Sequence, residues 1–122
     1  MKVSKLINLP TYSCDLTIII TDQLKVESKK IYKKYKLEED EEDEENEGLL
    51  ITADGGKYFL LISTKYLTHN TVAHEIYHAT VRITEDRNVV DEEAQAWLCG
   101  HITADMYKFI EKKKLVITHG RG

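Results

Sequence analysis

The sequence predicts a small α+β domain with a strand and a helix first, then a β-hairpin, then two helices. Three observations predict this order. The apolar run at residues 16–20 is typical of a strand covered on both faces. An Asp-Gly pair at positions 54 and 55 separates two further apolar runs and indicates a tight hairpin turn. Two stretches with the apolar spacing of helices fill the second half of the chain.

The first half of the chain holds the expected strand, at residues 14–22, and a lysine-rich helix. Asp22 is expected to cap that helix. Leu24, Ile31 and Tyr35 share one face of the helix, at spacings of seven and four residues. Residues 37–47 break every periodicity, so we expect an acidic loop there.

The second half begins with the hairpin, whose antiparallel strands are expected at residues 49–53 and 58–63. The next helix is expected to have Asn70 or Thr71 as its cap and to end near Asn88 in a left-handed position. The last helix is expected at residues 91–114, capped by Asp91. Acidic residues fill its first turn and lysines its last, which suits the helix dipole.

The two predicted C-terminal helices each have a face that we expect to be buried. The inward face of the first comprises Val72, Ala73, Ile76, Tyr77, Thr80 and Ile83. In the last helix small residues repeat every four positions, which predicts close approach of another backbone at Ala96, Gly100 and Ala104.

The 122 residues suffice for one domain, which we place at residues 1–114, followed by a flexible tail at 115–122 in which His119 is incidental. No apolar run is long enough to cross a membrane, and the first residues lack the features of a secretory signal. The expected location is therefore the cytoplasm, with Cys14 and Cys99 as reduced thiols.

The net charge of −4 conceals two opposite blocks. Residues 38–47 carry nine of the 21 acidic residues, which leaves 12 acids against 17 lysines and arginines. Six lysines lie at residues 25–36, directly before the acidic run. This pattern is typical of a solvated helix followed by a disordered loop, and nucleic-acid binding is not expected. A second interpretation is that the acidic run folds back onto the lysines or a basic cleft as a tethered competitor.

The sequence HEIYH, at residues 74–78, is the motif that carries chemistry. Side chains four residues apart lie above one another on a helix, so His74 and His78 can bind one ion. Glu75 then stands beside the ion, where it can take a proton from metal-bound water. The chain's own residue frequencies predict the motif by chance about 0.02 times, so zinc binding is the favoured interpretation. The alternative is two histidines with ordinary hydrogen-bond partners.

A catalytic zinc ion needs a third protein ligand. No third histidine follows at the spacing of the longer HExxHxxGxxH pattern, so a carboxylate from the last helix is the better source. We expect Glu93, with Glu92 as the alternative, because Glu93 precedes the face of small residues. These acids also have a simpler explanation, which is compensation of the helix dipole.

The sequence HEIYH followed by EAQAW resembles the gluzincin pattern of ImmA/IrrE-type metallopeptidase-like proteins, especially small members carried by phages and mobile elements. The likeness covers residues 49–107. It implies that His74, His78 and Glu93 bind zinc and that Glu75 activates water. These proteins commonly have an asparagine four residues after the glutamate, where this chain has Trp97.

Two functions follow from these residues. The first is a minimal zinc-dependent metallopeptidase of narrow specificity, in which residues 58–63 pair with an extended peptide and His101 or Tyr107 stabilises the oxyanion. A protein or peptide is the expected substrate, in the host cytoplasm if a phage encodes the protein. The second is a catalytically silent zinc-binding module that uses its acidic segment to bind a basic partner or to imitate nucleic acid.

Overall fold

The computed structural model describes residues 1–38 and 47–118. The described elements, in chain order, are β1 (Lys2–Leu9), η1 (Pro10–Tyr12), β2 (Cys14–Thr21), α1 (Leu24–Tyr35), β3 (Gly48–Ala53), β4 (Lys57–Ser63), η2 (Thr64–Tyr66), α2 (His69–Asp86) and α3 (Glu92–Lys112). The fold is α+β, as predicted, with one mixed sheet of four strands in the described residues. Most of the predicted acidic loop and His119 lie outside these residues.

The sheet has the strand order β1-β2-β4-β3. β2 and β4 are parallel, with α1 and β3 between them in the chain, whereas β1 and β3 pair antiparallel with their neighbours at the two edges. The predicted hairpin is confirmed, with Gly48 opposite Ile62 and both turn glycines at positive φ. The prediction that residues 58–63 are free to pair with a peptide is wrong, because β4 is paired on both sides.

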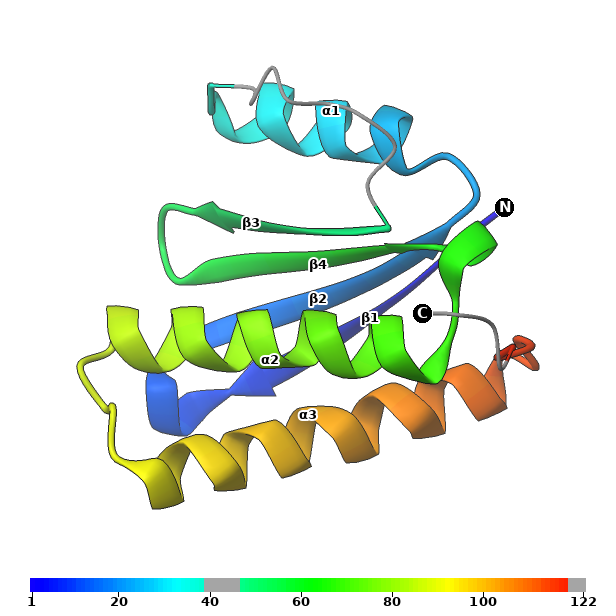
Figure 1. Ribbon diagram of the computed structural model, residues 1–122. Helices are drawn as coiled ribbons and strands as arrows, with labels where there is room; N and C mark the ends of the chain where they lie inside the picture. Colours follow the sequence, from blue (N-terminus) through cyan, green and yellow to red (C-terminus); the bar gives the residue numbers. More distant parts are fainter. Residues whose placement is uncertain (39–46, 119–122) are drawn as a thin grey trace.

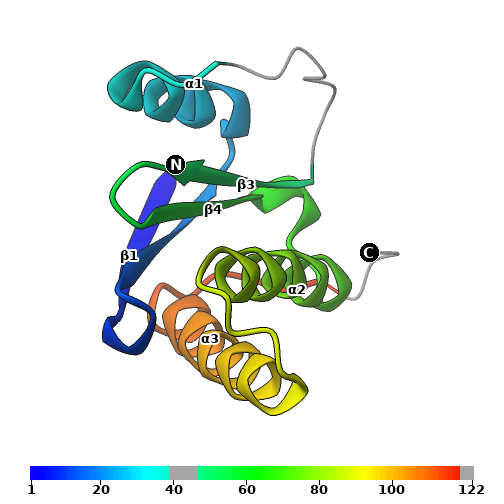
Figure 2. The same ribbon diagram turned by 90° about the vertical axis from the view of Figure 1, so that its left-hand side faces the viewer.

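The helices cover both faces of the sheet. α1 lies on one face and α2 and α3 lie on the other (Figure 1), so that three layers are visible end on (Figure 2). β2 is buried on both faces, as predicted: Leu16, Ile18 and Ile20 pack towards α2 and α3, and Ile19 packs towards α1.

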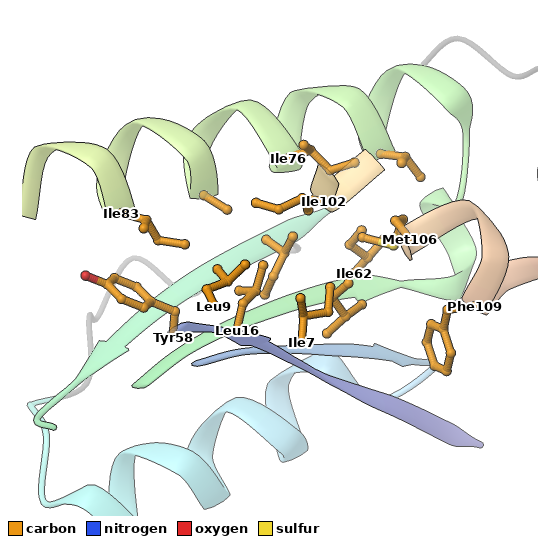
Figure 3. Close-up of a cluster of buried hydrophobic side chains, with 14 of the residues drawn as sticks. Ile7, Leu9, Leu16, Tyr58, Ile62, Ile76, Ile83, Ile102, Met106 and Phe109 are labelled. Atoms are coloured by element: carbon orange, nitrogen blue, oxygen red, sulfur yellow. The ribbon is translucent and has the colours of Figure 1, made fainter. Parts of the chain in front are cut away.

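The larger core lies between the sheet and the pair α2 and α3 (Figure 3). Tyr58 and Ile62 of β4 lie there among apolar side chains from both helices. Its helical residues, all below 5% exposed, include Val72, Ile76, Ala79, Ile83, Leu98, Ile102, Met106, Phe109 and Ile110. Each large side chain buried in this way contributes about 1.5–3 kcal/mol. This core fixes which faces of α2 and α3 remain exposed.

β1 has no counterpart in the sequence prediction. Only Ile7 and Leu9 of this strand are buried, while Lys2, Lys5 and Leu6 are exposed, so its apolar alternation is weak. Its conformation is stabilised by full antiparallel pairing with β2. An edge strand of this kind depends on a neighbour more than on its own pattern.

Two of the predicted helix ends are confirmed. Asp91 caps α3, since its Oδ1 accepts a hydrogen bond of 2.8 Å from the amide of Ala94. Asn88, after α2, has a φ of 57°. Asparagine tolerates this left-handed conformation better than most residues, which is why it suits the end of a helix.

Two predicted caps are wrong. Asp22 binds the N-terminal ammonium group of Met1 at 2.8 Å, and Gln23 occupies the start of α1 without a side-chain cap bond. α2 begins earlier than predicted, and its cap is Thr68, whose hydroxyl accepts a hydrogen bond of 3.1 Å from the amide of Thr71.

The exposed faces of α2 and α3 also differ from the prediction. Tyr77 is 64% exposed, and Ala73 is exposed as well. Ala96, Gly100 and Ala104 are exposed, and nothing lies within 4 Å of a Cβ placed on Gly100. The predicted close approach of a backbone to α3 is therefore wrong; larger apolar side chains, from Leu98 to Ile110, form its buried face.

The chain continues against the domain after α3. Leu115 and Ile117 pack on the larger core, and the amide of Thr118 donates a hydrogen bond of 3.0 Å to the carbonyl of Leu67. Both cysteines are free thiols. Within the part of the chain that is described, no helix is long and apolar enough to cross a membrane.

Candidate metal centre

His74 and His78 lie on the exposed side of α2 and point towards the same place. Their Nε2 atoms are 3.0 Å apart, and the rings meet edge to face with centroids 4.6 Å apart. Two imidazole ligands of a tetrahedral zinc ion have nitrogens about 3.3 Å apart, if each bond is about 2.0–2.1 Å. The pair therefore fits two of the ligands of such an ion. It also fits an imidazole–imidazole hydrogen bond, which is the simpler alternative.

Glu75 is the buried member of the motif, at 7% exposed. It lies beneath the start of β3, where a Cβ on Gly48 would be 2.6 Å from both Cγ and Cδ of Glu75. Burial raises the pKa of its carboxyl group, the nearby His78 and His74 lower it, and the charge of Glu47 raises it further. A proton-accepting group is thus held beside the imidazole pair and out of bulk water.

Glu47 joins this group from outside α2. Its Oε2 accepts a hydrogen bond of 3.3 Å from the hydroxyl of Thr71, which in turn accepts one of 3.1 Å from the hydroxyl of Thr68. The amide of Ser63 donates to the carbonyl of Glu47 at 3.0 Å. Sequence reasoning placed Glu47 in the acidic loop and gave it no role. The one signal in the sequence was its position directly before β3, the first strand of the hairpin that precedes the motif helix.

Glu93 and Glu92 are exposed in the first turn of α3. α2 and α3 run antiparallel, and the side-chain Nε2 of Gln95 donates a hydrogen bond of 3.1 Å to the hydroxyl of Thr84. Glu93 is therefore level with the end of α2, about eight residues or 12 Å along the helix axis from His78. Among residues 1–38 and 47–118, no three His, Cys, Asp or Glu side chains are gathered as metal ligands. The structure does not bring either glutamate to the pair.

The two candidates for oxyanion stabilisation have partners elsewhere. His101 stacks on Trp97 with centroids 5.3 Å apart, and its Nε2 is 3.6 Å from Asp105. The hydroxyl of Tyr107 is 2.9 Å from Nδ1 of His69, at the start of α2. Trp97, four residues after Glu93, thus takes part in an aromatic stack on α3.

A lysine-lined groove of about 240 Å³ lies on the other face of the sheet, between α1 and β1. Tyr35 and Phe59 lie in its wall with Lys34. Glu27 neutralises two of its lysines, because it lies 3.1 Å from Lys2 and 3.3 Å from Lys30. This groove is separate from the histidine pair. The acidic segment proposed as its competitor lies mostly outside the described residues.

Comparisons with protein-family models, with curated proteins and with solved structures found no match to this chain. Its function is therefore argued from its own residues.

Proposed function

We propose that the chain is a zinc-dependent metallopeptidase of the HExxH type, with a minimal zincin-like arrangement of sheet, motif helix and following helix. The observation that carries this proposal is the convergence of the His74 and His78 Nε2 atoms at 3.0 Å, with Glu75 buried beside them. Ordinary surface histidines do not require a buried carboxylate next to them, and burying one is costly without compensation.

Each residue has a distinct role in this proposal. His74 and His78 would hold the ion. Zinc would supply a Lewis acid that polarises a peptide carbonyl and makes water more acidic. Glu75 accepts a proton from the attacking water and returns it to the leaving nitrogen. Burial raises the pKa of Glu75, which strengthens it as a proton acceptor.

The substrate is a peptide that binds in extended form along β3. β3 is an edge of the sheet, and its first residue, Gly48, lies directly on Glu75. A peptide added at this edge would form backbone hydrogen bonds while passing the histidine pair. β3 thus takes the role that the sequence analysis gave to residues 58–63.

A second candidate is a zinc-binding module without catalysis. One observation favours it: both histidines are exposed. Such a module would bind a partner rather than cleave it.

One set of proteins separates the candidates. Wild-type protein should contain about one zinc per chain by atomic emission, and His74→Ala should lose it. Glu75→Gln should keep the zinc but stop cleavage of a peptide library followed by mass spectrometry. Cleavage by wild type alone supports the peptidase. If wild type and Glu75→Gln both contain zinc and neither cleaves a peptide, the silent module is the remaining candidate. If His74→Ala contains as much zinc as wild type, both candidate functions are excluded.

A further inference from the structure

We propose that Glu47 is the third protein ligand of the metal centre. This inference rests on the proposed function, because it concerns the ion held by His74 and His78. A catalytic zinc site requires three protein ligands, and the bond from Gln95 to Thr84 places Glu93 near the end of α2, away from the pair. The third carboxylate must then come from another element near the exposed side of α2.

Glu47 lies beside the correct stripe of α2. Thr71, His74, Glu75 and His78 have the spacing i, i+3, i+4 and i+7, so their side chains follow one another on one helical face. Residues three or four apart on such a face have Cβ atoms about 5–6 Å apart. The carboxylate of Glu47 accepts a hydrogen bond from the hydroxyl of Thr71, one turn before the motif. Glu93, by contrast, is level with the far end of the helix.

The backbone at Glu47 is held in place while its side chain stays exposed. The amide of Ser63 fixes its carbonyl, and the next residue, Gly48, is paired with Ile62 and packed on Glu75. In this structure the carboxylate accepts a hydrogen bond from Thr71 and does not form a ligand set with the imidazoles of His74 and His78. Glu47 would bind the ion only in place of its hydrogen bond with Thr71, after a rotation of its side chain.

The local charge favours this exchange. The carboxylates of Glu47 and Glu75 carry like charges and are close enough to act on each other. Like charges held together favour a cation between them. A divalent ion with one carboxylate as ligand and the other as base makes the group neutral.

The test measures Zn²⁺ affinity by competition with a chromophoric chelator. Glu47→Gln should weaken binding about 100-fold or more, because even an outer partner of a ligand contributes 10–100-fold. Glu93→Gln, Glu92→Gln and the matched control Glu111→Gln should stay within about twofold of wild type. Co²⁺-loaded Glu47→Gln should also have a visible absorption spectrum that differs from that of the Co²⁺-loaded wild type, since one ligand has changed.

A second variant should strengthen Zn²⁺ binding instead of weakening it. Thr71→Val removes the competing hydrogen bond, so Zn²⁺ should bind about 2–10-fold more tightly, and this gain should vanish when Glu47→Gln is added. If Glu47→Gln binds Zn²⁺ like wild type while His74→Ala does not, the inference is overturned and the proposed function survives. If His74→Ala also binds like wild type, the proposed function fails.

Discussion

Replacing Gly48 with alanine tests the contact between β3 and the buried carboxylate. The added Cβ would lie 2.6 Å from Cγ and Cδ of Glu75 and 3.0 Å from its Oε1. Carbon atoms in contact prefer about 3.5–4.0 Å, so Glu75 must move by about 1 Å or more. Glu75 is only 7% exposed and has little room to move.

The expected cost of Gly48→Ala is about 1–3 kcal/mol in the free energy of unfolding, which is typical of overpacking. The backbone itself does not oppose the change, because Gly48 is not among the residues with positive φ. An alanine in a strand is favoured over glycine by about 0.5–1 kcal/mol. In a Glu75→Ala background the clashing atoms are gone, so Gly48→Ala should become neutral or stabilising by that amount.

The assay is a double-mutant cycle by urea unfolding of wild type, both single variants and the double variant. The two substitutions should couple by about 1.5–4 kcal/mol, from the clash and the strand preference together. The same cost for Gly48→Ala in both backgrounds would show that the side chain of Glu75 does not lie against β3.

Two further predictions concern stability. The buried phenol of Tyr58 donates a hydrogen bond of 2.7 Å to Asp86, and burial and this bond raise its pKa from 10.0 to about 12. Tyr58→Phe should lower the free energy of unfolding by about 1.5–3 kcal/mol at pH 7. The stabilisation by Tyr58 is complete below pH 10 and is lost as the pH rises to about 12, so the gap between the two proteins should close over that range. A gap that does not change with pH, in urea unfolding, would refute the assignment. Gly100→Ala, in an open position of α3, should raise the free energy of unfolding by about 0.5–1 kcal/mol, and a loss in thermal unfolding would show that a neighbour does approach there.

The sequence predicted the parts of the fold that carry strong local signals. The apolar run of β2, the Asp-Gly turn, Asn88 and the cap Asp91 are all confirmed. β1 was missed because its polar side chains conceal a strand that forms through pairing with β2. Tyr77 was misplaced because periodicity alone does not tell where the edge of a buried face lies.

The site was predictable only within one helix. The spacing of His74 and His78 gives their convergence directly, since both belong to α2. The expected contribution of α3 depended on how two helices pack. The small residues around Gly100 suggested a close contact, but Gln95 and Thr84 fix a different register. Glu47 could not be found from sequence, because only the sheet pairing brings it beside Thr71.

The most direct test of the metal centre is the Zn K-edge X-ray absorption spectrum of the zinc-loaded wild-type protein. The spectrum should show two imidazole ligands and oxygen ligands at about 2.0–2.2 Å, with the imidazole signal lost or reduced in His78→Ala. A spectrum without imidazole scattering, or one dominated by sulfur at about 2.3 Å, would contradict the proposed metal centre.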